Sequence, residues 1–133
     1  MRLHYFLLRG IAGLAGLGLL MPTGAGAVRN ATTVNVTAGK PSEFGFVLSK
    51  KVLPHGTVTF RLKNGGTVPH DLKICASPKG GLANSCTGKG TKLIAPAQST
   101  TLTYTFKSKG TYEYLCTVPG HAAAGMKGDL KVT

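Results

Sequence analysis

The stretch Thr57-Val58-Thr59-Phe60-Arg61-Leu62-Lys63 alternates strictly between polar and apolar side chains. Successive side chains of a β-strand point to opposite faces, so this pattern predicts a strand with one face in a core and the other in solvent. Residues 100–106 repeat the pattern, with Leu102, Tyr104 and Phe106 on one face. Strands of this kind need a second layer to cover their apolar face.

Turn-forming residues separate further stretches that are rich in β-branched and aromatic residues. No window of 11 residues after the N-terminal segment combines helical periodicity with capping residues. We therefore expect an all-β fold, an antiparallel β-sandwich of about seven or eight short strands. The predicted strands are residues 31–37, 43–48, 57–63, 68–75, 91–95, 100–106, 111–116 and 127–133.

The N-terminal segment has the three parts of a secretory signal peptide. Residues 1–9 contain two arginines and no acid, residues 10–21 are an apolar run, and Ala25-Gly26-Ala27 is a small-residue cleavage site. A retained membrane anchor is the alternative, but a spanning helix needs about 20 apolar residues. We predict a signal peptide over 1–27, cleavage near Ala27, and one domain over 28–133 that is periplasmic or otherwise exported.

The predicted mature chain is strongly basic. Removal of Arg2 and Arg9 from the 16 basic residues leaves 14, against four acidic residues, which gives a net charge of +10. Such a domain is attracted to anionic partners, and we expect an acidic redox protein such as a cytochrome or an oxidase domain. Contact with an anionic membrane surface is an alternative, and lysines that only solvate the surface are another. Nucleic acid is not expected, because no basic cluster is interleaved with stacking aromatic residues.

The chain has three cysteines, which in an exported protein make one pair and one remaining thiol. Cys75 and Cys86 bracket a loop-forming stretch, and we predict a disulfide between them. Cys116 is then the unpaired cysteine. Because a free thiol in an oxidising compartment is a liability, a bound metal would explain its presence.

Cys116 begins a segment in which a thiol, an imidazole and a thioether recur every fifth residue, as Cys116, His121 and Met126. His70 offers a second imidazole upstream. Two histidines, a cysteine and a weak axial methionine are the ligand set of copper sites that transfer electrons. Taken singly, His70 could be an ordinary core histidine and Met126 a core filler. Together they predict a copper site, from which we exclude His55, in an apparent exposed turn.

Residues 57–75 and 111–126 resemble the cupredoxin family of blue copper proteins, in the plastocyanin and azurin group. The Cys-x4-His-x4-Met spacing is similar to that of azurin, and Val68-Pro69-His70 is more similar to plastocyanin. The resemblance implies a Greek-key sandwich with one type 1 copper, held by the four residues named above. The family usually has Asn where this chain has Asp71, at a position that ties the two ligand loops together, and Thr117 is its expected partner.

This ligand set predicts a protein that shuttles single electrons between redox partners and acts as a monomer. An enzyme is not expected, because four ligands leave no open position and neither Leu115 nor Thr117 can pass electrons to a second metal. A copper-holding or copper-delivery protein of the cell envelope is the alternative. We expect His121 to be the electron port, within an apolar patch formed by neighbours that include Ala122 and Ala123.

Overall fold

The alternating stretches become strands of a two-layered structure in the computed structural model, which describes residues 31–133. The predicted signal peptide, with its cleavage near Ala27, lies outside the described residues. Within 31–133 no helix is long and apolar enough to cross a membrane. The strands of this part of the chain are β1 (Thr32–Ala38), β2 (Phe46–Leu48), β3 (Val52–Leu53), β4 (Gly56–Asn64), β5 (Lys73–Cys75), β6 (Gly88–Gly90), β7 (Ser99–Phe106), β8 (Gly110–Leu115) and β9 (Lys127–Val132).

Strand β4 shows why the alternation decides the layering. Val58, Phe60 and Leu62 are each at most 1% exposed, whereas Arg61 and Lys63 are exposed. Strand β7 pairs with β4 along its whole length, from Gly56 opposite Phe106 to Lys63 opposite Ser99. The two strands therefore present one continuous apolar face to the other layer.

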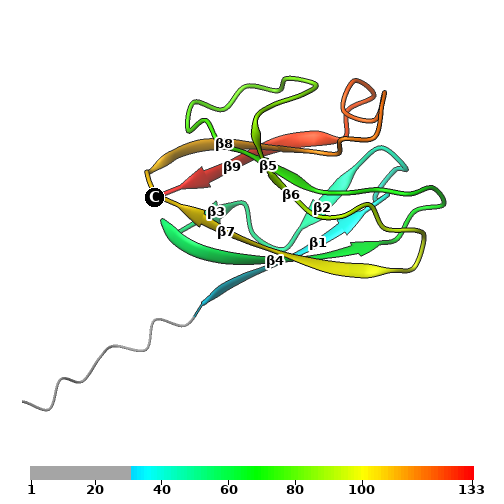
Figure 1. The fold of residues 1–133 in the computed structure, drawn as a ribbon, viewed down its shortest axis with the longest axis horizontal. Coiled ribbons are helices and arrows are strands. Elements are labelled where there is room, and N and C mark those ends of the chain that lie inside the picture. Colours follow the sequence, from blue (N-terminus) through cyan, green and yellow to red (C-terminus); the bar gives the residue numbers. More distant parts are fainter. Residues whose placement is uncertain (1–30) are drawn as a thin grey trace, which may run out of the picture.

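The strands form two sheets, with orders β2-β1-β4-β7 and β3-β9-β8-β5-β6. Figure 1 shows these sheets as two layers, and the buried apolar side chains fill the space between them. Phe106 of β7 packs against Tyr112 of β8 with ring centroids 4.8 Å apart, a contact that joins the two layers. The predicted sandwich is confirmed, with nine strands in residues 31–133 where seven or eight were expected.

The expectation of a wholly antiparallel sandwich is wrong, because both sheets are mixed. Strands β1 and β4 pair in parallel, as do β3 and β9. Side-chain alternation reports which face of a strand is buried, and it is the same for either strand direction. The direction depends on how the connections cross between the layers, which the local pattern does not encode.

Two predicted strands around the site are also wrong. Of the predicted strand 68–75 only Lys73–Cys75 is a strand, and residues 91–95 form none. Instead His70 and Ile94 make a single antiparallel bridge. His70, Asp71 and Leu72 are all buried, so this segment does not alternate. Its consecutive side chains contact different partners, an arrangement that the regular alternation of side chains in a strand does not provide.

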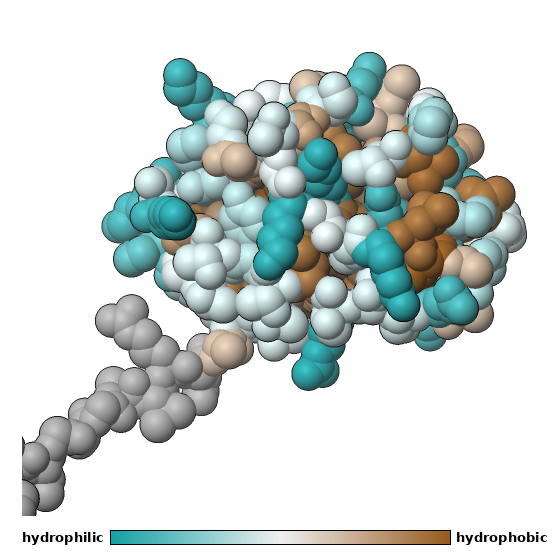
Figure 2. Space-filling model, viewed as in Figure 1, coloured by the Kyte–Doolittle hydropathy of each residue, from teal (hydrophilic) through white to brown (hydrophobic). Residues whose placement is uncertain are grey.

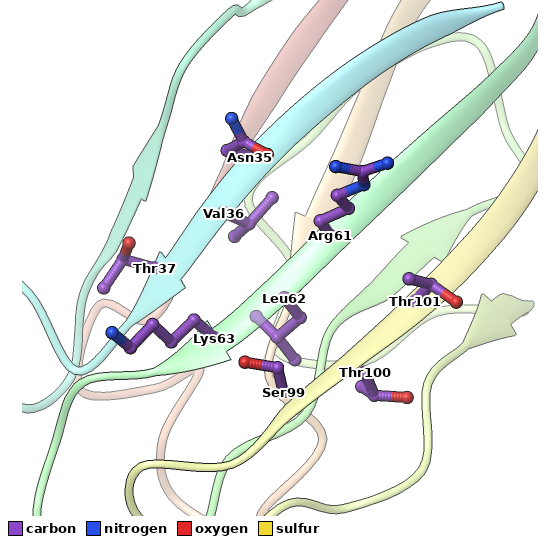
Figure 3. Close-up of a pocket in the computed structure, with 9 residues that line it drawn as sticks. All are labelled: Asn35, Val36, Thr37, Arg61, Leu62, Lys63, Ser99, Thr100 and Thr101. Atoms are coloured by element: carbon purple, nitrogen blue, oxygen red, sulfur yellow. The ribbon is translucent and has the colours of Figure 1, made fainter.

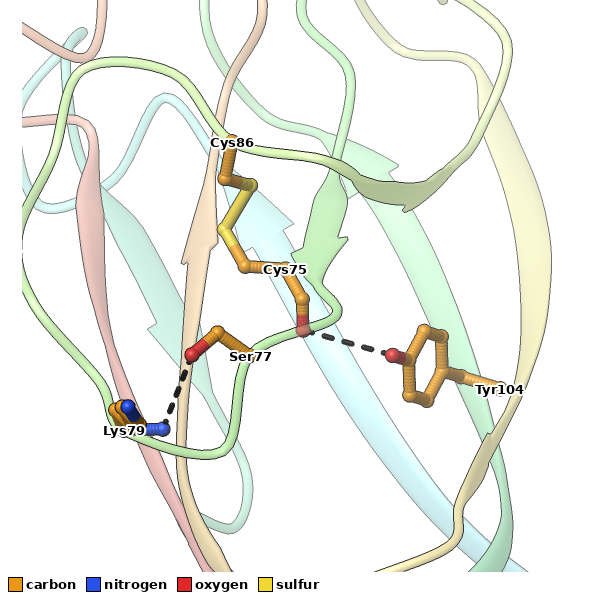
Figure 4. Close-up of a disulfide and its surroundings, with 5 residues drawn as sticks. All are labelled: Cys75, Ser77, Lys79, Cys86 and Tyr104. Atoms are coloured by element: carbon orange, nitrogen blue, oxygen red, sulfur yellow. Dashed lines mark hydrogen bonds between the residues drawn. A yellow bond between two sulfur atoms is a disulfide. The ribbon is translucent and has the colours of Figure 1, made fainter.

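The predicted disulfide between Cys75 and Cys86 is present, with an S–S distance of 2.01 Å (Figure 4). It closes the long connection between β5 and β6. Next to it, the amide of Ala76 donates to the carbonyl of Thr87 at 2.8 Å. The connection is therefore fastened at its base, beside the strand that leads away from His70.

Candidate metal centre

Cys116 directly follows β8, whose last residues are buried. The thiol is 1% exposed, and the backbone amide of Cys116 donates to the carbonyl of Met126 at 3.1 Å. This bond joins the two ends of the loop that carries the sequence motif. The loop is thus closed between β8 and β9, which are antiparallel neighbours.

Tight turns bring His121 back toward Cys116. The amide of His121 donates to the carbonyl of Val118, and the amide of Met126 donates to the carbonyl of His121, both at 3.0 Å. Gly120 and Gly125 have φ of 84° and 109°, in the region that favours glycine. Gly125 therefore turns the chain directly before Met126.

His70 approaches Cys116 and His121 from a separate segment of the chain. Its backbone bridge to Ile94 consists of two hydrogen bonds, of 3.1 and 2.9 Å. The side chain is fully buried. Figure 1 shows the segments that carry these residues at one end of the sandwich, the end opposite the C-terminus.

The donor atoms of His70, Cys116 and His121 lie within 4.8 Å of one another. The Cys116 Sγ is 4.0 Å from the His70 Nδ1 and 3.6 Å from the His121 Nδ1. Metal bonds of about 2.0 Å to nitrogen and about 2.3 Å to sulfur allow two donors on one ion to lie up to about 4.3 Å apart. Both sulfur–nitrogen distances are within that limit, so the Cys116 sulfur can share an ion with the nitrogen of either histidine, and the three residues form a group that could hold one metal ion.

The chemistry of the donors also favours a soft metal. Burial raises the pKa of the Cys116 thiol to about 11, so only a nearby cation would make it a thiolate at neutral pH. Burial and the nearby His70 lower the pKa of His121, which keeps the imidazole neutral and able to bind a metal. A thiolate with two imidazoles is a set that suits copper.

Two further residues of the sequence analysis, Met126 and His55, differ in burial. Met126 is fully buried at this end of the core, and its backbone contacts tie it to Cys116 and His121. His55 is exposed, and its Nδ1 lies 3.4 Å from the carbonyl of Thr133, away from the three clustered donors. The exclusion of His55 from the site is therefore consistent with its position.

Asp71 ties the two ligand loops together, as the resemblance implied. Its Oδ1 accepts from the amide of Thr117 at 2.6 Å, and its Oδ2 accepts from the Thr117 hydroxyl. An ionised carboxylate can only accept hydrogen bonds, and both partners here are donors. Aspartate therefore performs the connecting role at a position where asparagine was expected.

A second carboxylate, that of Glu43, was not predicted from the sequence. The Glu43 Oε1 lies 2.7 Å from the His70 Nε2, and the carboxylate also accepts from Thr67 and Val68. Hydrogen bonds from His70 and Thr67 hold the pKa of Glu43 at about 2. No local signal could have shown this contact, because Glu43 is in another loop and precedes His70 by 27 residues.

Asn64 was also missed, because it precedes Gly65 and Gly66, and such a sequence is typical of a turn. The side chain is fully buried and donates to the carbonyls of Val68 and Ile94 at 2.9 and 3.1 Å. Its Oδ1 accepts from the amide of Gly66 at 2.9 Å. Asn64 thereby fastens the loop that leads into His70.

The surroundings of His121 are apolar, although one residue that was expected in the exposed patch, Ala122, is not part of it. Pro119, Ala123 and Ala124 are exposed, but Ala122 is buried against the disulfide and Leu115. Phe44, which is 41% exposed, packs against the His121 ring with centroids 4.9 Å apart. In Figure 2 apolar side chains gather at the end of the molecule that carries the ligand loops in Figure 1.

A separate depression of 440 Å³ crosses the outer face of β1, β4 and β7 (Figure 3). It presents Arg61 and Lys63 with several hydroxyl groups, and no cysteine, histidine or methionine lines it. It therefore contains no ligand for a soft metal.

Comparisons with known proteins agree with this site. Over 43 residues the chain is 46% identical to auracyanin-B of Chloroflexus aurantiacus, an alignment that covers 32% of this chain and 18% of that protein. Among solved structures, auracyanin B has a TM-score of 0.63 at 28% identity, covering 77% of this chain and 89% of that one.

Two further solved structures are similar to this chain. Auracyanin A of the same bacterium, described as a "blue" copper protein, has a TM-score of 0.62 at 27% identity, covering 78% of this chain and 100% of that one. Rusticyanin of Thiobacillus ferrooxidans has a TM-score of 0.59 at 27% identity, covering 76% of each chain. The sequence profile of the copper-binding proteins of the plastocyanin/azurin family matches residues 30–133. The chain therefore belongs to the plastocyanin/azurin family of copper-binding proteins, the cupredoxins, with copper as its cofactor.

Proposed function

We propose that this protein carries single electrons between redox partners through one copper ion bound by His70, Cys116, His121 and Met126. The observation that carries the proposal is the position of the Cys116 sulfur, within 4.0 Å of one Nδ1 atom from each histidine. Copper in such a ligand set exchanges one electron between its two oxidation states.

The protein holds the donors in place from several directions. Asp71 connects the segment of His70 to that of Cys116, and the amide of Cys116 bonds to the carbonyl of Met126. A firmly held ligand set limits the rearrangement that accompanies each change of oxidation state. This restraint supports a carrier that exchanges electrons repeatedly.

The ligand set also supports a carrier over an enzyme. Four donors leave no position for a substrate, and the neighbours of Cys116 are Leu115 and Thr117, neither of which binds a second metal of this kind. Electrons would then leave through the outer edge of the site. The partly exposed His121 ring, with Phe44 beside it, is the proposed port.

Burial of the ligands favours this function over copper delivery. His70, Cys116 and Met126 are each at most 1% exposed, so an acceptor cannot reach them without opening the loops. The predicted mature chain also has one methionine and three histidines, fewer than the exposed, exchangeable clusters of a delivery protein would need.

The partner and the location are part of the same proposal. The signal-like residues 1–27 support export, with a monomeric domain over 28–133 working outside the cytoplasm. The net charge of +10 supports an acidic partner, such as a cytochrome or an oxidase domain. Steering by charge predicts that the rate of electron exchange with such a partner falls as salt rises.

Titration of the purified apoprotein with Cu(II) tests the proposal. We expect an intense blue colour at one equivalent, reversible one-electron reduction, and retention of the copper in the presence of a competing chelator. Cys116→Ser should lose the colour while its circular dichroism stays that of a folded sandwich. A colourless complex that releases its copper readily would refute electron transfer and favour delivery.

A further inference from the structure

Within residues 31–133, the carboxylate of Glu43 accepts hydrogen bonds from the loop that leads into His70. It accepts from the Thr67 amide at 3.0 Å, from the Thr67 hydroxyl at 2.8 Å and from the Val68 amide at 3.3 Å. Its remaining contact is with the His70 Nε2 at 2.7 Å. Because an ionised carboxylate has no proton to donate, the hydrogen of this contact belongs to His70.

This proton position decides what the other nitrogen of the ring can do. A neutral imidazole carries one hydrogen, so a hydrogen on Nε2 leaves Nδ1 with a free lone pair. The His70 Nδ1 faces the Cys116 Sγ at 4.0 Å, on the side where the donor atoms gather. The contact with Glu43 therefore presents the metal-binding nitrogen in the form that can bind.

We infer that Glu43 is a positioning residue for the metal centre: its carboxylate fixes the tautomer and orientation of His70 and places a negative charge one imidazole ring away from the copper. A carboxylate that accepts the second ring hydrogen of a metal-binding histidine makes that histidine a stronger ligand. The added charge stabilises Cu(II) more than Cu(I), so it lowers the reduction potential. Only the part of this inference that concerns the reduction potential of the copper rests on the proposed function.

The position of Gly66 is a second observation that supports the role. A Cβ atom at residue 66 would clash with the Glu43 Oε1 and lie 3.0 Å from the His70 Nε2. The Glu43 carboxylate is the end of a flexible side chain and would have to move aside. Glycine at this position thus leaves room for the contact between Glu43 and His70.

The contacts of Glu43 with Thr67 suggest a competing explanation, in which the carboxylate only fastens one loop to another. The side chain of Glu43 is 27% exposed, whereas that of His70 is fully buried. Water can replace Glu43 at the Thr67 hydroxyl, which is itself exposed, far more easily than at the buried ring of His70. The two explanations therefore predict different effects when the contact of Glu43 with Thr67 is removed and when its contact with His70 is removed.

Four variants separate these effects. Glu43→Ala removes the acceptor and the charge, whereas Glu43→Gln keeps an oxygen for His70 and removes only the charge. Thr67→Val removes the hydroxyl contact but leaves the carboxylate on His70. Asp129→Asn removes one negative charge from an exposed position on β9 and is the charge-matched control.

The first measurement is ¹⁵N NMR of the metal-free protein, with the exposed His55 as an internal reference. We expect His70 to hold its hydrogen on Nε2, with slow exchange, in the natural protein and in the Thr67→Val and Asp129→Asn variants. Glu43→Ala should give a mixture of tautomers or fast exchange. A hydrogen on Nδ1 of His70 in the natural protein, or an unchanged spectrum in Glu43→Ala, would overturn the inference.

The second measurement is the Cu(II) affinity and reduction potential of the copper-loaded variants. Loss of such a supporting partner typically weakens metal binding by about 10- to 100-fold. We expect Glu43→Gln to weaken Cu(II) binding more than Cu(I) binding, and each tenfold difference between the two raises the potential by about 59 mV. A potential in Glu43→Gln equal to that of Asp129→Asn would overturn the electrostatic role.

The two measurements distinguish failure of this inference from failure of the proposed function. If the protein forms no blue copper complex, the proposed function fails, but the tautomer of His70 in the metal-free protein still reports on Glu43. If the blue complex forms and neither the tautomer nor the potential depends on Glu43, the inference fails and the proposed function stands.

Discussion

Replacement of Asp71 by alanine should separate the two ligand loops, and the structure allows its cost to be worked out. Asp71 is 8% exposed and accepts two hydrogen bonds from Thr117, one from the amide at 2.6 Å and one from the hydroxyl. Hydrogen bonds to charged groups contribute about 1.5 to 3 kcal/mol each. Thr117 is exposed, so water recovers part of this loss, and we expect the variant to lose about 3 kcal/mol of stability in total.

Urea denaturation of the metal-free protein measures this cost directly. Asp129→Ala is the matched control, because Asp129 is an exposed acid whose carboxylate accepts no hydrogen bond from the described residues, and the change should alter stability by less than about 0.5 kcal/mol. Asp71→Asn should cost only about 1 kcal/mol, since its amide oxygen can still accept from Thr117. A loss below about 1 kcal/mol in Asp71→Ala would refute the view that this carboxylate joins the loops.

Three further predictions concern residues away from the donor atoms. Asn64→Ala should lower the stability measured by chemical denaturation by about 2 to 4 kcal/mol, because three hydrogen bonds of a buried amide are lost. The same change at the exposed Asn35 should cost little, and equal effects of the two changes would contradict the role of Asn64. Replacement of Cys75 and Cys86 together by serine should cost about 3 kcal/mol and leave the blue colour intact, which denaturation and absorption spectra would check. Burial and the nearby Tyr112 raise the pKa of Tyr104. The phenol of Tyr104 therefore loses its proton at a lower pH in the unfolded chain than in the folded one, and the natural protein should lose stability above about pH 10. Tyr104→Phe should remove this part of the pH dependence, and identical curves of stability against pH for the two proteins would contradict it.

The period-two pattern was sufficient to predict the layering, because it records which side chains are buried. Phe60 and Leu62 are in the core, and Arg61 between them is exposed, as the alternation requires. The parallel pairing of β1 with β4 could not be predicted in this way, since a strand alternates identically in either direction. The segment from His70 to Leu72 was predicted as part of a strand, although it is an irregular buried segment.

The candidate site was predictable as far as its chemistry is local. Cys116, His121 and Met126 are near one another in sequence, and closure of one loop between antiparallel strands keeps them near one another in space. The connection of Asp71 to Thr117 was anticipated only through the resemblance to a known family. The exposure of Ala122 was predicted wrongly, because a loop sequence does not show which of its small residues lies against a disulfide.

By itself, the order of residues determined the soft donor set and the strand faces of this protein, because ligand chemistry and side-chain alternation are properties of neighbouring residues. Only the tertiary structure decided which distant groups meet around His70. Glu43 and Ile94 reach it from two separate segments, and Asn64 fastens Ile94 from a third; their approach depends on how two sheets pack and where each loop is fastened. Contacts of this kind arise from the packing of the whole domain, so no local pattern records them.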